Sequence, residues 1–283
     1  MSARAFLTNL IVVASVMAFA ALLETAAPLF VAHAWTRGRR VANLGLTAVV
    51  FLLNWLLASL AAIIALGLSV RSASVFGGVH APSAIQIVVG VLVLDFSTGY
   101  LAHRIMHAWP AMWRFHRVHH SDDFVDVTTT YRTHPVETVW RFLFAIVPVW
   151  VLGIPAAAVV IQRLLQASNG VLEHANIRLW APIDRALSLV WVTPNVHKIH
   201  HSRQLAETNS NYGNILTIYD RALGTYTPSE RVHSVIYGLD DADPVRSVSF
   251  PGLLSMPFRE ATPATPDSGP STAAVSARAA SQQ

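Results

Sequence analysis

The feature that most constrains this chain is a run of 25 residues, 44–68, without a single charged side chain. A helix needs about 20 apolar residues to cross the hydrocarbon core of a bilayer. Within that core, only helices and closed barrels satisfy every backbone hydrogen bond. The run therefore predicts a transmembrane helix, and with it a helical membrane protein.

The composition of the whole chain points the same way. Charged residues make up 13% of the 283 residues and hydrophobic residues 53%, and the mean hydropathy is +0.44. A soluble globular domain is about 25% charged, so this chain has too little charge to coat a soluble globule, and a disordered or coiled-coil chain would need still more. The basic residues are scattered along the sequence, which argues against nucleic acid as a partner. The absence of cysteine excludes disulfides, iron–sulfur clusters and thiolate metal sites.

Two further apolar runs, 6–23 and 84–101, are long enough to span a membrane. The first run has a competing interpretation as a signal peptide, because residues 32–34 resemble a cleavage site. An uncleaved helix is favoured, since Glu24 and Pro28 interrupt the run well before that site. The third run leads directly into the first histidine pair, and Asp95 within it is costly in a bilayer, which indicates a buried or functional role.

Residues 139–161 are also apolar, but Pro148, Gly153 and Pro155 interrupt them. We expect these residues to divide the segment into two arms, each too short to span comfortably. A helical hairpin that returns to the same side of the membrane fits this pattern better than one straight helix.

The orientation of the spans follows from the basic residues. Arg37, Arg39 and Arg40 lie in the predicted first loop, which the positive-inside rule places in the cytoplasm. The N-terminus and the Ser/Gly-rich loop 69–83 are then outside, and the histidines after residue 101 are on the cytoplasmic side. We predict an all-α, polytopic helical membrane protein with a cytosolic, histidine-rich helical cap. Its regions are residues 1–83 with the N-terminal membrane helices, 84–235 with the histidines, and a C-terminal segment 236–283 that is disordered after about residue 260.

Histidine is the residue type that points to function. Ten of the 13 histidines lie between His103 and His201. They include an HxxxH at residues 103–107, an HxxHH at 116–120 and a second HxxHH at 197–201. Random placement of 13 histidines would give about 0.03 HxxHH motifs in the chain, so chance explains two of them poorly. On a helix, positions i, i+3 and i+4 project from one face, and several imidazoles that meet at one point suit Fe, Zn, Cu or Ni.

The order and spacing of these motifs resemble the fatty acid hydroxylase/sterol desaturase superfamily. Asp95 with Tyr100, the stretch from Arg132 to Pro135, residues 211–213 and residues 220–226 add to the resemblance, which covers about residues 90–227. In that family a helical membrane domain lies beneath a cytosolic cap. The resemblance implies two non-haem irons held by the histidines, O2 as co-substrate and an external electron donor. The implied metal ligands are His103, His107, His116, His119, His120, His174, His197, His200 and His201.

Two positions carry further information about the family. His134 matches a family position, which makes it a candidate catalytic residue, either as a metal ligand or as support for the ligands. Some hydroxylases of the family carry another HxxxH before the last motif, whereas Arg178 stands four residues after His174. This difference leans away from the fatty-acid 2-hydroxylase branch. His33, His80 and His233 lie outside the motifs and are expected to be structural.

The activity that the resemblance implies is hydroxylation or desaturation of a lipid or sterol-like substrate in the membrane. No segment resembles a flavin, haem or iron–sulfur domain, so a separate electron-transfer protein is the expected partner. Four alternatives remain. Two are a non-enzymatic membrane protein that binds or transports metal and a zinc-dependent membrane hydrolase, which the absence of HExxH disfavours. The others are a haem-binding electron carrier, which needs two facing axial histidines and not three motifs, and a cationic, histidine-rich surface that binds lipid through residues such as Arg104 and Lys198.

Overall fold

The computed structural model describes residues 3–31, 36–67, 82–243 and 245–259, in which isolated β-bridges occur but no strand. The predicted all-α class is therefore confirmed for this part of the chain. Its α-helices are α1 (Ala3–Ala26), α2 (Thr36–Gly67), α4 (Ser83–Leu94), α5 (Ala102–Ala108), α6 (Pro110–His120), α7 (Pro135–Leu152), α8 (Ala156–His174), α9 (Ala181–Leu187), α10 (Pro194–His200), α11 (Leu205–Thr208), α12 (Ile218–Ala222) and α13 (Phe250–Ser255). The π-helix η1 (Asp95–Leu101) and the 3₁₀ helices η2 (Val127–Tyr131), η3 (Val232–Ser234) and η4 (Met256–Phe258) complete the set.

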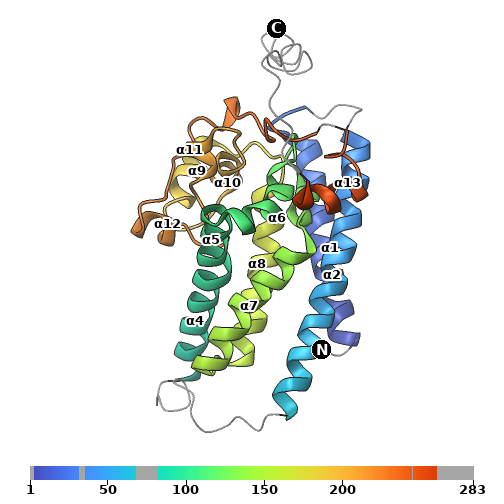
Figure 1. Cartoon of the computed structure of the whole chain (residues 1–283). Coiled ribbons are helices and arrows are strands. Elements are labelled where there is room, and N and C mark those ends of the chain that lie inside the picture. The colour runs from blue at the N-terminus through green and yellow to red at the C-terminus, as the bar shows by residue number, and fades with distance from the viewer. Residues whose placement is uncertain (1–2, 32–35, 68–81, 244, 260–283) are drawn as a thin grey trace.

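The long helices form a bundle, and the short helices form a cap at one end of it (Figure 1). Among the residues that the structure describes, three helical segments are long and apolar enough to cross a membrane, namely Arg37–Leu60, Ser83–Ala108 and Pro135–Leu152. The protein is thus an integral membrane protein. Helix α1 is present where the sequence predicts it, with an apolar stretch of Leu10–Ala26 that is shorter than the other three, and its crossing of the membrane stays a prediction.

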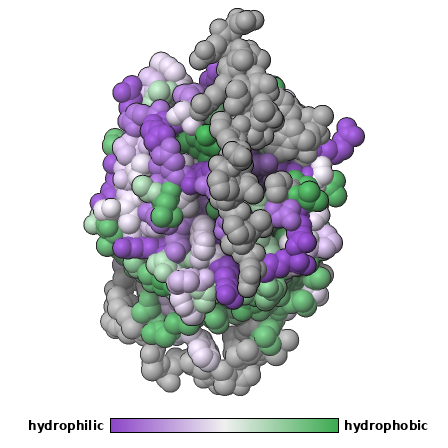
Figure 2. Space-filling model, turned by 45° about the horizontal axis from the view of Figure 1, so that its top comes forward, coloured by the Kyte–Doolittle hydropathy of each residue, from purple (hydrophilic) through white to green (hydrophobic). Residues whose placement is uncertain are grey.

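The apolar and polar residues of the protein separate along the bundle axis. Figure 2 shows hydrophilic side chains gathered over the capped end and hydrophobic ones toward the opposite end. Many apolar side chains of the long helices are exposed, for example Leu52 at 54% and Val147 at 56%. Exposed apolar surface of this kind is what a helix presents to lipid.

The predicted hairpin is present. Its turn lies at Gly153 and Pro155, whereas Pro148 does not interrupt the helix. Helix α7 continues through Pro148 and ends at Gly153, whose φ of 71° is left-handed. Membrane helices tolerate proline because neighbouring groups satisfy the hydrogen bonds that it removes. A left-handed glycine followed by Pro155 instead stops the helix, and α8 begins at Ala156. The arms are therefore longer than expected, and α7 alone is long enough to span.

The third span brings the first histidine pair to the cap, as the sequence predicts. Helix α4 continues through the π-helix η1 into α5, so that one continuous helical segment carries His103 and His107 at its end. Asp95 opens the π-helix and is buried, with 1% of its surface exposed. After α5, Trp109 is extended and Pro110 starts α6 at its first position, where proline costs no hydrogen bond.

The arginines used to orient the chain lie within α2, not in a loop before it. Arg39 is fully buried and pairs with Asp122, at 2.7 Å, and with Asp126. Arg40 is half-exposed and bonds Asp126 at 3.0 Å. Helix α2 can start before its apolar run because these carboxylates neutralise the cations. The network ties the beginning of α2 to the segment that follows the histidines of α6.

The segment after residue 235 packs back onto the bundle. Leu253 of α13 is fully buried against Ala42, Leu46 and Val118. The predicted loop at residues 69–81, the tail from 260 onward and the cleavage-like residues 32–34 lie outside the described residues, as do His33 and His80.

Candidate metal centre

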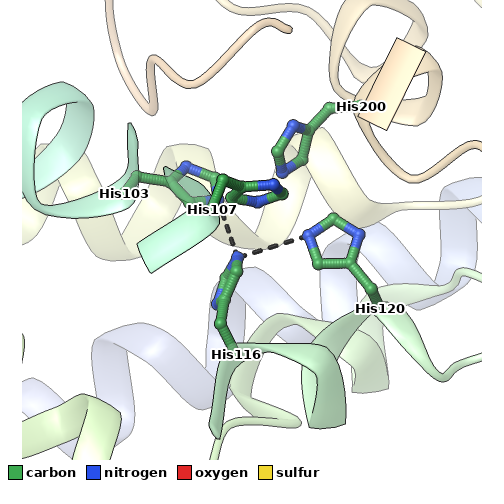
Figure 3. Close-up of side chains that lie close together, drawn as sticks. All are labelled: His103, His107, His116, His120 and His200. Carbon is green, nitrogen blue, oxygen red and sulfur yellow. Dashed lines mark hydrogen bonds between the residues drawn. The ribbon is translucent and has the colours of Figure 1, made fainter. Parts of the chain in front are cut away.

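The nine histidines that were expected to bind metal lie in two adjoining groups. In each group, one ring nitrogen per residue lies within 4.8 Å of all the others. Figure 3 shows the rings of the first group, which point toward one another from α5, α6 and α10. The five-histidine group consists of His103, His107, His116, His120 and His200, and the four-histidine group of His119, His174, His197 and His201.

Each HxxHH motif is shared between the two groups. His116 and His120, four residues apart on α6, enter the five-histidine group, whereas His119 enters the other. The second motif does the reverse, with His197 and His201 in the four-histidine group and His200 in the five-histidine group. The rings of His120 and His201 are 4.7 Å apart between centroids. The two groups are thus interlocked by the helices that supply them.

Local sequence explains how α10 presents His197 and His200, with His201 directly after its last residue. Thr193 caps the helix by accepting a hydrogen bond from the backbone N–H of Val196 at 3.3 Å, and Pro194 occupies the first helical position. Both residue types are favoured at these positions. The Thr193 hydroxyl also donates to Asp184 Oδ1 at 2.5 Å, which fixes the start of α10 against α9.

Most rings of the five-histidine group are oriented by hydrogen bonds outside the group. The Nδ1 atom of His103 donates to the Tyr212 carbonyl at 2.8 Å, and that of His200 to the Ser210 carbonyl at 2.7 Å. The remaining two bonds are His116 Nδ1 to Glu137 Oε2 at 3.0 Å and His107 Nδ1 to Asn209 Oδ1 at 3.2 Å. A neutral ring that donates from Nδ1 has a lone pair on Nε2, so these bonds direct lone pairs toward the centre of the group.

The distances between these lone pairs fit a metal ion. The Nε2 atoms of His103 and His116 are 3.0 Å apart, and those of His116 and His120 are 3.2 Å apart (Figure 3). Since the Nδ1 atoms of His103 and His116 are donors, their facing Nε2 atoms carry no proton and repel unless a cation lies between them. Imidazole nitrogens about 2.1 Å from one ion, at right angles, would be about 3 Å apart. The donor set therefore fits a divalent transition metal.

The four-histidine group has the same spacing but fewer external hydrogen bonds. The Nε2 atom of His174 lies 3.1 Å from those of His119 and His197 and 3.2 Å from that of His201. His174 Nδ1 donates to the Gly170 carbonyl at 2.6 Å. The Nδ1 atoms of His119, His197 and His201 have no hydrogen-bond partner among the described residues. This group fits a metal equally well by spacing, but only His174 has its tautomer fixed.

Burial keeps these rings in the form that binds metal. Loss of water lowers the pKa of His116, His119, His120, His197 and His201 well below 6.5, and that of His200 to about 4. The neighbouring histidines and Arg141 lower several of these pKa values further. A neutral imidazole is the ligand form for a metal ion.

The burial of these residues also argues against a cationic lipid-binding surface. Eight of the nine rings belong to buried residues, and His107 is partly buried. Lys198 is buried as well and donates to the Ala175 carbonyl. These side chains point inward, where they cannot contact a membrane surface.

A cavity of about 400 Å³ reaches the histidines from the bundle. His103, His119, His174 and His197 line its upper end, and apolar side chains such as Val50 and Phe142 line much of the remainder. Arg141 and Glu137, which pair at 3.0 Å, also lie in its wall. The cavity is of a size and polarity that suit an apolar chain.

His134 lies outside both groups. Its Nδ1 accepts a hydrogen bond from the backbone N–H of Val136 at 3.2 Å, which makes it the cap of α7, and its ring packs against Phe115 and Phe258. Glu137, three residues later in the first turn of α7, faces the centre, and its carboxylate accepts from His116 and Arg141.

Several residues that orient the rings were not identified from the sequence. Glu137 is an acidic residue in the first turn of an apolar helix, which was a usable signal because such residues rarely occur in membrane spans without a partner. The backbone carbonyls of Tyr212 and Ser210 cannot be recognised in the sequence as acceptors, because every residue type has a backbone carbonyl. Glu173 lies 3.8 Å from His197 Nε2 and accepts from Asn214 at 2.8 Å, which its position beside His174 did not reveal.

Comparisons with known proteins show which families and proteins this part of the chain resembles. Residues 87–225 match the family model described as fatty acid hydroxylase. Ornithine lipid hydroxylase OlsE of Rhizobium tropici is 36% identical over 159 residues, which are 56% of this chain and 46% of the relative. Alkylglycerol monooxygenase is 30% identical over 152 residues in Xenopus tropicalis, covering 52% of this chain and 31% of the relative. In Homo sapiens it is 27% identical over 172 residues, covering 58% and 36%.

The matched region covers less than half of the length of each of these relatives. No solved structure matches the chain significantly.

Proposed function

Since the chain belongs to the fatty acid hydroxylase superfamily, we propose that it is a membrane-bound, O2-dependent di-iron oxidoreductase that oxidises a lipid or sterol-like substrate. The observation that carries the proposal is the pair of histidine groups at the end of an apolar cavity. The names of the relatives, a hydroxylase and monooxygenases, favour hydroxylation over desaturation.

The proposed metal ligands are the nine histidines of the two groups. His103, His107, His116, His120 and His200 would hold one ion, and His119, His174, His197 and His201 the other. When bound, two irons supply the oxidising power that an unactivated C–H bond requires.

The protein's own residues contribute orientation and exclusion of water. Glu137 holds the ring of His116, and the Tyr212 carbonyl holds that of His103, so that their Nε2 atoms stay convergent. The apolar wall of the cavity binds the hydrocarbon chain and keeps bulk water from the centre. His134 supports this arrangement from outside the groups, as the residue that starts α7 and so positions Glu137.

We place the histidine centre on the cytoplasmic side of the membrane, with electrons delivered by a separate protein. Arg37 supports this orientation, because it lies at the capped end of α2 and the positive-inside rule assigns such residues to the cytoplasm. Arg39 and Arg40 count for less, since both pair with carboxylates within the protein.

The proposal is tested by metal content and isotope incorporation. Detergent-purified protein, reconstituted under iron, should contain about two irons per chain, and the double variant His119→Ala, His200→Ala should lose both because it removes one ligand from each group. The matched control is His233→Ala, an exposed histidine outside both groups, which should keep the metal. With a reductase system and ¹⁸O₂, membrane lipid extracts should gain ¹⁸O. Failure of iron to bind after reconstitution would contradict the proposal, whereas zinc bound in place of iron together with ¹⁸O-independent lipid hydrolysis would favour the hydrolase.

A further inference from the structure

Helix α8 contributes many residues to the cavity wall, and four of them form a row. Arg163, Ala167, Gly170 and His174 follow one another at intervals of four, three and four residues and all line the cavity. Such residues lie in a row on one face of a helix. The row runs from the histidine centre into the bundle for about 16 Å, at 1.5 Å per residue.

The residues in the middle of this row are small, and Thr130 and Asn214 lie 3.6 Å from the position that a Cβ of Gly170 would take. Ala167 carries only a methyl group and Gly170 no side chain, so neither fills the cavity between His174 and Arg163. Apolar residues of α2 and α7, including Phe51 and Phe142, form the opposite wall. An extended hydrocarbon chain can therefore lie along α8 between the two ends of the row.

Arg163 ends the row with a positive charge at the depth of the spans. Its Nη1 lies 3.5 Å from Asn54 Oδ1, which is long for a hydrogen bond. Asn54 belongs to the span Arg37–Leu60, and Phe142 and Ala145, which line the same cavity, belong to Pro135–Leu152. A cation at this depth is costly, and such residues mark substrate or ion sites.

Arg163 is an exposed residue of α8, and two other arginines of the protein differ from it in having carboxylate partners. Arg141, which lines the same cavity, pairs with Glu137 at 3.0 Å, and the buried Arg39 pairs with Asp122. Arg163 forms no ion pair with any carboxylate of the described residues. A guanidinium that lines a cavity without a carboxylate partner is suited to bind an anionic ligand group.

We propose that Arg163 binds the anionic oxygen group of a lipid, a carboxylate or a phosphate, whose hydrocarbon chain lies along α8 toward the histidine centre. The substrate class is then an anionic single-chain lipid. The distance from Arg163 to His174 sets which carbon reaches the centre. The identification of this lipid as a substrate rests on the proposed function, but its binding does not.

The test is the binding of three probes with the same sixteen-carbon chain to the detergent-solubilised full chain: hexadecanoate, hexadecyl phosphate and neutral hexadecan-1-ol. Binding is measured by equilibrium titration with tritiated probes, without added metal, for the unchanged protein, Arg163→Met and Arg163→Lys. The matched control is Arg185→Met, which removes an exposed arginine of α9 away from the cavity. Metal binding is measured in parallel on reconstituted samples.

We expect Arg163→Met to weaken the binding of one or both anionic probes about tenfold or more and to leave the binding of hexadecan-1-ol unchanged. Arg163→Lys should retain most of the affinity, and Arg185→Met all of it. Which anion binds more tightly distinguishes a carboxylate from a phosphate. Equal binding of all three probes to the unchanged protein, no effect of Arg163→Met, or an equal loss for all three probes would overturn the proposal. A chain that binds the anionic probe through Arg163 yet holds no metal would instead contradict only the proposed function.

Discussion

The two histidine groups have the same ligand chemistry but differ in how the protein supports them. Four of the five rings in the five-histidine group have an Nδ1 hydrogen bond to a described residue outside the group. In the four-histidine group only His174 has one. Hydrogen bonds of this kind fix the ring and its tautomer. The five-histidine group is therefore the more preorganised of the two.

The groups also differ in their access to the cavity. Three members of the four-histidine group, His119, His174 and His197, line the cavity, but only His103 of the other group does. The four-histidine group has one histidine fewer and forms more of the cavity wall, so a lipid bound in the cavity would approach this group first. The difference suggests that one site is built for rigidity and the other for access.

The largest effect is expected when two ligands of one group are removed at a time. We expect His197→Ala with His201→Ala to lose about one of two metals and all turnover, and His116→Ala with His120→Ala to lose the other metal, because each pair supplies one group. Metal content by mass spectrometry and ¹⁸O incorporation measure both effects. Loss of both metals from either double variant would mean that the groups do not bind independently.

The next largest effect is expected from the buried ion pairs of Arg39. Replacing Arg39 with Met leaves Asp122 and Asp126 buried without their main partner, which should cost roughly 3–5 kcal/mol of unfolding free energy. Both groups should be affected alike, because the network holds the segment after α6 and α6 serves both groups. Reversible SDS-induced unfolding followed by circular dichroism measures the change.

The control for this variant is Arg40→Met, which breaks a half-exposed pair and should cost only about 0–1 kcal/mol. Similar losses of unfolding free energy for the two variants would show that the buried ion pairs of Arg39 stabilise the fold no more than the half-exposed pair of Arg40.

A smaller effect, confined to one group, is expected at Glu137. Glu137→Ala removes the acceptor of His116 Nδ1 and should weaken metal binding in the five-histidine group about 10- to 100-fold, while the four-histidine group keeps its affinity. Competition with a chelator, read as two separate release steps, measures this. Glu137→Gln retains an acceptor oxygen and should have less effect. An equal loss of metal affinity in both release steps would argue that Glu137 acts on the whole fold.

The smallest effect is expected at Asn209, whose hydrogen bond to the partly buried His107 is the longest of the four, at 3.2 Å. Asn209→Ala should weaken metal binding in the five-histidine group by less than about tenfold. The same chelator competition measures it. A loss as large as that of Glu137→Ala would contradict the ranking of these supports by hydrogen-bond geometry.

Much of the fold was predictable because it depends on patterns local in the sequence. Apolar runs of sufficient length gave the helices α2 and α4 through α5, and the Gly153–Pro155 pair gave the turn of the hairpin. The same patterns misplaced the beginning of α2 by eight residues, since the charges of Arg37, Arg39 and Arg40 indicated a loop. The neutralisation of Arg39 and Arg40 by Asp122 and Asp126 depends on residues more than 80 positions away, which no local pattern contains.

The sequence by itself determined which residue types are available for chemistry, because HxxxH and HxxHH on helices place imidazoles on one face. It also indicated the family through the order of those motifs. Only the tertiary structure decided how the nine rings divide, and it divided each HxxHH between two groups. Whether a ring one turn away faces the same point or its neighbour depends on how α6, α8 and α10 pack. The placement of the carbonyls that fix the tautomers, and the cavity along the row from His174 to Arg163, likewise exist only once those helices are in contact.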